Sequence, residues 1–136
     1  MKHAPIRKVV IPVAGYGTRF LPFTKAMPKE MLPIIDKPVI QFVVEEAIAA
    51  GVTDIILVTS STKRPIEDHF DQNIELEGWL KKQGKEDLLE QVQAISKMAN
   101  FIYVRQKGPY GNAIPVLNAS HLIGDEAFAV LWGDEL

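Results

Sequence analysis

A β-branched run that leads into two closely spaced glycines most constrains how this chain folds. Residues 9–11 read Val-Val-Ile, the pattern of a buried strand, and Gly15 and Gly17 follow. A turn built from glycines exposes backbone N–H groups and lets an anion approach them closely. The pattern predicts a phosphate-binding turn at the carboxyl end of the first strand.

The segment after the glycines carries positive charge and is rich in proline. Prolines stand at 22, 28, 33 and 38, and each one fixes φ and disfavours a helix before it. We therefore expect residues 13–38 to form a stiff, extended loop rather than a long helix. The loop presents Arg19 and Lys29, whose charges suit phosphate oxygens. It matches neither the dinucleotide-binding glycine pattern, which needs a third glycine, nor a P-loop.

Strand-like and helix-like segments alternate along the remaining chain. Apolar runs predict strands at 54–59, 101–105 and 127–132, and helical spacing predicts helices at 39–50, 65–70, 73–83, 85–98 and 112–122. This order implies an α/β fold, a Rossmann-like three-layer α/β/α arrangement with a mostly parallel sheet. In such folds the functional residues lie at the carboxyl ends of the strands.

Three local expectations accompany this assignment. Asp36 is expected to cap the first helix, and Pro12, which has no N–H, is expected to end the pairing of the first strand early. The apolar side of the helix at 85–98 is expected to belong to the core. Its members are Leu88, Leu89, Val92 and Ile95.

Length and composition exclude several classes of protein. The 136 residues, 47% of them apolar, suit one domain over 1–136. A net charge of −2 gives no general attraction for nucleic acid, and the lack of cysteine excludes disulfides and thiolate metal sites. The sequence shows neither a signal-peptide pattern nor an apolar run of membrane-spanning length. We expect a cytoplasmic protein without membrane partners.

The pattern GxGTR followed by P, T and PK is similar to the signature of the sugar-1-phosphate nucleotidylyltransferases. Within that superfamily the chain most resembles the bacterial UTP–glucose-1-phosphate uridylyltransferases. The matching stretches are AGYGTRFLP at 14–22, TKAMPKEMLPIIDKP at 24–38 and QFVVEEAIAAG at 41–51. The resemblance implies a fold of the nucleotide-diphospho-sugar transferase type. It also implies an Mg²⁺-dependent enzyme that forms UDP-glucose and pyrophosphate from UTP and glucose 1-phosphate.

The resemblance also assigns residues to roles. Arg19 and Lys29 would be catalytic and hold the triphosphate, and Asp134, within Gly-Asp-Glu, would bind the metal. The nucleotide-binding residues would be Ala14, Gly15, Gly17, Thr18, Glu30, Gln106 and Gly111. Gln106 and Gly111 would face the base, because a carboxamide both donates and accepts like the edge of uracil. Glu135 is left out of the metal set, because successive side chains of an extended chain point in opposite directions.

Two alternatives to this assignment stay open. A non-catalytic nucleotide-binding module would need no Asp134, so the presence of that residue favours an enzyme. A thymidylyltransferase-type sugar nucleotidyltransferase is the other alternative. Ala113 and Pro115 stand where the uridylyltransferases usually carry glycine and alanine, which weakens the assignment of the base. Glu30 favours UTP, because thymidylyl relatives tend to carry glutamine there.

The chain ends at Leu136, directly after the proposed metal site, whereas members of the resembling family continue well beyond this point. We therefore expect a truncated chain that binds nucleotide and has weak or no activity. An open sheet edge favours pairing with another copy, so we also expect a homo-oligomer.

Overall fold

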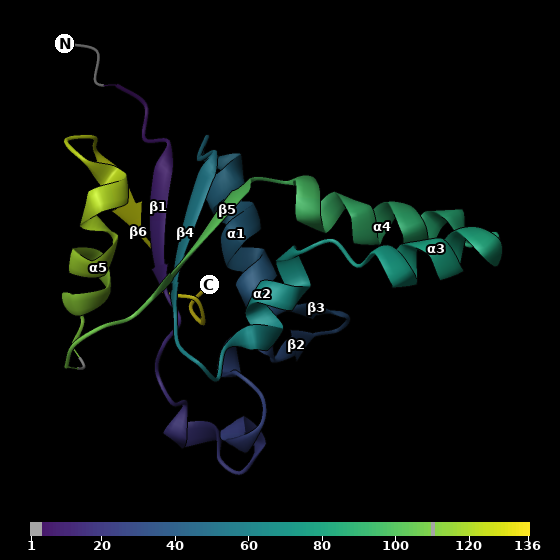
Figure 1. Ribbon diagram of the computed structural model, residues 1–136, viewed down its shortest axis with the longest axis horizontal. Helices are drawn as coiled ribbons and strands as arrows, with labels where there is room; N and C mark the ends of the chain where they lie inside the picture. Colours follow the sequence, from purple (N-terminus) through teal and green to yellow (C-terminus); the bar gives the residue numbers. More distant parts are fainter. Residues whose placement is uncertain (1–3, 110) are drawn as a thin grey trace.

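The computed structural model describes residues 4–109 and 111–136, which form a parallel sheet with helices on both faces (Figure 1). The strands of this sheet are β1 (Lys8–Pro12), β4 (Asp54–Thr59), β5 (Asn100–Arg105) and β6 (Phe128–Val130). The helices are α1 (Val39–Ala49), α2 (Arg64–Phe70), α3 (Ile74–Lys82), α4 (Glu86–Lys97) and α5 (Ile114–Ile123). The predicted α/β class with a parallel sheet is confirmed. None of the described helices is long and apolar enough to cross a membrane.

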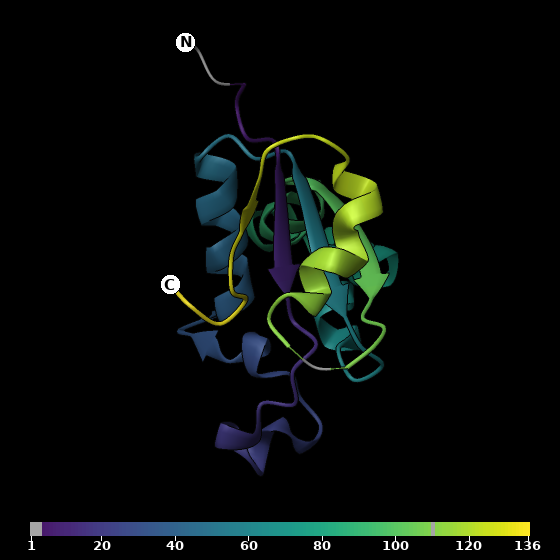
Figure 2. The same cartoon turned by 90° about the vertical axis from the view of Figure 1, so that its left-hand side faces the viewer.

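Alternate residues of the central strands face two separate cores. Val9 and Ile11 of β1 belong to the cluster that α1 and α2 cover, with side chains that are fully buried. Val10 points the other way and packs with Ala119 and Ile123 of α5. Figure 2 shows α1 and α5 on opposite sides of the sheet. The period-two alternation of a strand therefore produces the three layers.

The strand order places a crevice between β1 and β6. The order in space is β5-β4-β1-β6. Strands β4 and β5 are therefore added on one side of β1, and the last strand, β6, pairs with the other side of β1. In parallel α/β sheets, ligands bind outside the carboxyl ends of the strands where this reversal occurs. The segments that follow β1 and β6 both leave the sheet at this edge (Figure 2).

Pro12 ends strand pairing on one side only. Pairing with β6 stops at Val10, whereas pairing with β4 includes Pro12 opposite Val58. The next N–H, of Val13, donates to the Val58 carbonyl at 3.0 Å. Because N–H groups alternate in direction along a strand, the N–H that Pro12 lacks would face β6. The expectation of early termination is therefore wrong for β4.

The proline-rich loop is folded into turns rather than extended. It contains the 3-10 turns η1 (Thr18–Phe20), η2 (Phe23–Lys25) and η3 (Lys29–Met31), and a hairpin of β2 (Pro33–Ile34) with β3 (Lys37–Pro38). As predicted, no long helix forms there. Asp36 lies in the hairpin turn, and Pro38 occupies the N-cap of α1, so the expected cap is wrong. Ile35, with φ 64°, reverses the chain and takes Asp36 away from the helix.

Helices α3 and α4 form a hairpin that projects from the body of the protein (Figure 1). No residue of α4 is fully buried: Leu88 is 47% exposed, whereas Leu89, Val92 and Ile95 are half-buried, so the expected core stripe is wrong at Leu88 and only partly covered elsewhere. Ile95, near the end of α4, does pack against the main core. The helix pair extends beyond the sheet, and the end of α4 that contains Ile95 packs against the core.

His69 makes the stability of this fold depend on pH. Its Nε2 lies 2.8 Å from Oε1 of Gln41 on α1, and because an amide oxygen accepts, Nε2 carries the proton. Burial lowers the pKa of His69 below its ordinary value. The unfolded chain therefore binds more protons, so this stability is present above about pH 6.5 and is lost as the pH falls below it.

We expect the free energy of unfolding to fall between about pH 7 and about pH 5, with His69 contributing at most about 1.4 kcal/mol per pH unit. Urea unfolding at both pH values measures the loss. His69→Gln keeps an N–H donor and does not titrate, so it should lose less stability on acidification. An equal loss in the two proteins would show that His69 is not responsible.

Candidate functional site

The turn after β1 has a backbone that requires glycine at position 17. Gly17 has φ +63°, in the left-handed region, and directly precedes η1. The Thr24 hydroxyl donates to the Gly17 carbonyl at 2.7 Å. A Cβ on Gly17 would lie 3.0 Å from the Thr24 methyl group and 3.4 Å from Cβ of Lys29. The turn is thus held closely against the segment that carries Lys29.

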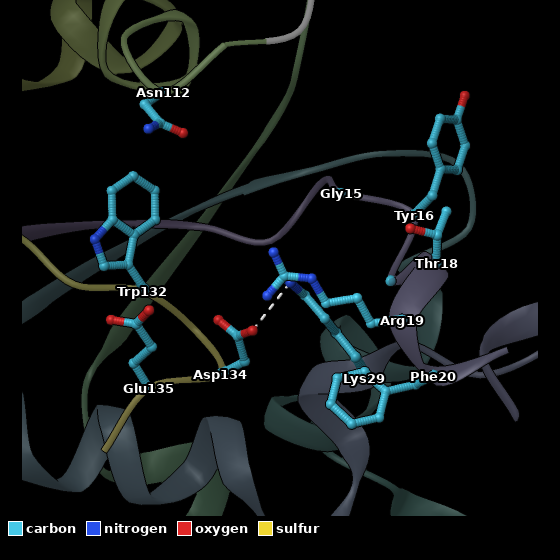
Figure 3. Close-up of a pocket in the computed structure, with 11 residues that line it drawn as sticks. Gly15, Tyr16, Thr18, Arg19, Phe20, Lys29, Asn112, Trp132, Asp134 and Glu135 are labelled. Carbon is cyan, nitrogen blue, oxygen red and sulfur yellow. Dashed lines mark ion pairs between the residues drawn. The ribbon is translucent and has the colours of Figure 1, made fainter.

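A cavity of about 580 Å³ opens between the turn after β1 and the segment after β6 (Figure 3). Five predicted site residues from the loop after β1 line this cavity. Asp134, from the segment after β6, lines it as well. These loop residues are Gly15, Gly17, Thr18, Arg19 and Lys29. The crevice expected from the strand order is therefore a real cavity, and it brings the predicted phosphate-binding residues together.

Opposite charges meet inside this cavity. Nζ of Lys29 forms an ion pair with Oδ2 of Asp134 at 3.0 Å, and both side chains remain about one-third exposed. Arg19 also points into the cavity (Figure 3). Solvent reaches the pair, so its net stabilisation is small, and the ammonium can exchange the carboxylate for a bound anion at little cost. The arrangement suits a ligand that brings both phosphate and a cation.

A second cavity, of about 300 Å³, adjoins the first and shares Gly15, Lys29 and Asp134 with it. Its walls also hold the remaining predicted nucleotide-binding residues, which come from three distant parts of the chain. These are Ala14, Glu30, Gln106 and Gly111. Gln106 follows β5, and its N–H donates to the Thr59 carbonyl at the end of β4 at 2.8 Å. That bond fixes the residue at the same sheet edge as the glycine turn.

Glu30 is held by a lysine that the sequence analysis did not single out. Its carboxylate accepts from Nζ of Lys63, with distances of 3.3 Å to Oε1 and 3.1 Å to Oε2. The side chains are 2% and 3% exposed. Burial raises the pKa of the Glu30 carboxyl, and the positive charge of Lys63 offsets part of that rise. Glu30 therefore lines the smaller cavity, while its carboxylate is paired with the ammonium group of Lys63.

Several cavity residues escaped the sequence analysis. Trp132, Asn112, Tyr16 and Phe20 line the larger cavity. Trp132 had a usable signal, because it follows the apolar run of β6 at the carboxyl end of the sheet, where functional residues gather. Glu135 lines the same cavity as Asp134, contrary to expectation (Figure 3). The chain turns there, with the N–H of Glu135 donating to the Trp132 carbonyl, so strand alternation does not apply.

The carboxylates at this end of the sheet suit a hard cation that is completed by phosphate oxygens. Among the residues that the structure describes, no group of three or more acidic, histidine or cysteine side chains forms a metal cage. Asp134 and Glu135 nevertheless both border the larger cavity. Mg²⁺ binds through one or two carboxylates plus substrate phosphates and water, so this donor set fits it.

Comparison with known proteins gives a consistent family. The sequence model of the nucleotidyl transferase family matches residues 8–135. A UTP–glucose-1-phosphate uridylyltransferase of Bacillus subtilis strain 168 is 58% identical over 131 residues, which cover 96% of this chain and 45% of that protein. The chain thus spans about half the length of the curated relatives it matches.

Solved structures give the same result. The UTP-bound UGPase of Acinetobacter baumannii superposes with a TM-score of 0.91 at 48% identity, over 95% of this chain and 46% of that one. A UDP-glucose pyrophosphorylase complexed with UDP-glucose has a TM-score of 0.78 at 46% identity, again over 95% and 46%. The fold described above therefore corresponds to the first part of theirs.

Proposed function

The chain belongs to the nucleotidyl transferase family and is a homologue of the bacterial UTP–glucose-1-phosphate uridylyltransferases, and from that premise we propose that it binds UTP for uridylyl transfer to glucose 1-phosphate. One observation carries the proposal. The glycine turn after β1 and the Lys29–Asp134 pair, at 3.0 Å, face the same cavity at the point where the strand order reverses. One of the similar structures is UTP-bound and another is complexed with UDP-glucose, which supports the choice of nucleotide.

In the proposed reaction a phosphate oxygen of glucose 1-phosphate attacks the α-phosphorus of UTP. The bond between the α-phosphorus and the bridging oxygen breaks, pyrophosphate leaves with that electron pair, and UDP-glucose forms. The attacking group belongs to the sugar phosphate, so the protein needs no nucleophile of its own. Its contribution is to position the two phosphates and to neutralise charge.

Arg19 and Lys29 are the cations assigned to that task. Both line the larger cavity, together with Gly15 and Gly17 of the glycine turn. A fixed cation at the triphosphate stabilises the charge that develops on the leaving pyrophosphate without reorganising. Lys29 would release Asp134 and contact phosphate when the nucleotide binds.

Asp134, with Glu135 beside it, would hold Mg²⁺. When bound there, the ion would supply Lewis-acid polarisation of phosphate oxygens. The protein would keep the Asp134 carboxylate on the wall of the cavity, one residue beyond the tightly packed Gly133.

The smaller cavity is assigned to the base and ribose. Gln106 there offers both a donor and an acceptor to the edge of uracil, and Gly111 leaves room for close approach. Thymine carries the same imide edge, so dTTP is the informative competitor. The ribose distinguishes the two nucleotides as well, because dTTP lacks the 2′-hydroxyl.

Calorimetric titration of this chain with UTP tests the proposal. We expect binding that tightens when Mg²⁺ is present, and weaker binding of dTTP under the same conditions. Adding glucose 1-phosphate and measuring pyrophosphate then tests for transfer. Mg²⁺-dependent binding without transfer would indicate a nucleotide-binding part that lacks its sugar site. UTP binding with the same affinity in the presence and absence of Mg²⁺ would favour a non-catalytic module. The absence of any UTP binding would contradict the proposal.

A further inference from the structure

Among the described residues, one ion pair has both side chains buried, and it is separate from the Lys29–Asp134 pair of the larger cavity. It joins Lys63, the residue before α2, to Glu30 of the 3-10 turn η3. The two residues are 33 positions apart in sequence. Both oxygens of the carboxylate lie within hydrogen-bond distance of the same ammonium group. The pair therefore ties the proline-rich loop of residues 13–38 to the loop that follows β4.

A buried pair of this kind is not needed for stability alone. Taking two charges out of water is costly, and well-packed apolar side chains of similar volume serve a core at least as well. What a buried pair adds is a fixed direction, since ammonium and carboxylate must meet in a defined geometry. Its placement indicates which groups it orients.

Glu30 lies next to the backbone that carries two charged groups of the cavity, Lys29 and Asp134. It directly follows Lys29, and the two side chains diverge, one toward Asp134 and the other toward Lys63. Its Cγ also lies only 3.2 Å from the place where a Cβ on Gly133 would stand. Gly133 in turn directly precedes Asp134. Moving Glu30 would therefore disturb the cation and the carboxylate together.

We propose that Lys63 is a positioning residue that, through Glu30, holds the ammonium of Lys29 and the carboxylate of Asp134 in register at the cavity. The proposal rests on the proposed function for its binding readout, although its structural readout does not need a ligand. Lys63 itself lines a different cavity, together with Thr24 and Pro28 of the proline-rich loop.

Lys63→Met tests this, because methionine keeps much of the volume and removes the charge. In crystal structures of the unaltered chain and the variant, we expect the 3.0 Å separation of Lys29 Nζ and Asp134 Oδ2 to exceed about 4 Å in the variant. Lys37→Met is the matched control, since it breaks the more exposed Lys37–Glu45 pair and should leave that separation unchanged. An unchanged separation in Lys63→Met would overturn the inference.

If Lys63→Met does not fold, the double variant Glu30→Gln/Lys63→Met replaces it. That variant leaves no unpaired buried charge, so it should fold. The same separation is then measured, with the same two outcomes.

A binding experiment separates positioning from general stabilisation. We expect Lys63→Met to weaken Mg·UTP binding about tenfold in the unaltered background and by a smaller factor when Lys29 is already methionine, because only the displacement of Asp134 then remains to be felt. A general loss of stability would weaken binding equally in both backgrounds, and that result would overturn the inference. If the unaltered chain binds no UTP, the proposed function fails, and the crystallographic separation still tests the role of Lys63.

Discussion

Replacing Lys29 by methionine should weaken the binding of Mg·UTP by about 10- to 100-fold, because a charge-assisted hydrogen bond to phosphate contributes about 1.5–3 kcal/mol. Lys29 lines both cavities of the site and is the only described lysine that does so. Any transfer to glucose 1-phosphate should slow by about 10²–10³, since the same charge neutralises the leaving pyrophosphate. Calorimetry measures the affinity, and pyrophosphate release measures the rate.

The control for this variant is Lys82→Met. Lys82 is exposed in the last turn of α3, on the hairpin that projects away from the sheet, and the change removes the same charge (Figure 1). It should leave the affinity unchanged. Equal effects of the two variants would mean that Lys29 acts only through net charge, and near-parental affinity of Lys29→Met would remove it from the site.

Gly133→Ala should destabilise the protein by about 1–3 kcal/mol, the usual cost of overpacking a well-filled core. The added Cβ would lie 2.7 Å from Cγ1 of Val13 and 3.2 Å from Cδ1 of Ile40. Val13 and Ile40 are 1% and 0% exposed, so neither has space into which to move. Because residue 133 directly precedes Asp134, relief of the clash should displace that carboxylate and reduce the effect of Mg²⁺ on UTP binding.

Gly78→Ala provides the matched control, with the same chemical change in a different setting. Gly78 lies within α3, and a Cβ there would meet no atom within 4 Å. Alanine should stabilise an exposed helix interior by about 0.5–1 kcal/mol. Urea unfolding of both variants should therefore give shifts of opposite sign. A stabilised Gly133→Ala protein would contradict the packing described around Gly133.

Local pattern was sufficient to predict most elements of the fold. The strand at Asp54–Thr59 and the helix at Ile114–Ile123, with Pro115 in its first turn, follow from apolar runs and proline chemistry. The same reasoning overstated the burial of α4, whose apolar side is half-buried at Leu89, Val92 and Ile95 and exposed at Leu88. Periodicity shows that one side of a helix is apolar, but it does not show whether another element covers that side.

Sequence reasoning identified the parts of the site that depend on local backbone requirements. It placed the glycine turn and Asp134 at the carboxyl ends of strands. The ion pair of Lys29 with Asp134 was not predicted, because it depends on β1 and β6 being neighbours in the sheet. The expectation that the Glu135 side chain points away from the side of Asp134 was wrong, because a turn replaces the strand at that point.

By itself, the sequence determined the α/β class, the glycine turn and the family signature, because these depend on residues close together in the chain. Only the tertiary structure decided that Lys63 pairs with Glu30 across 33 positions, and that Gly133 leaves no room for a side chain. Such contacts depend on how distant segments pack, and a buried lysine has the same sequence signature as an exposed one. The groups that orient the site were therefore visible only after the chain was folded.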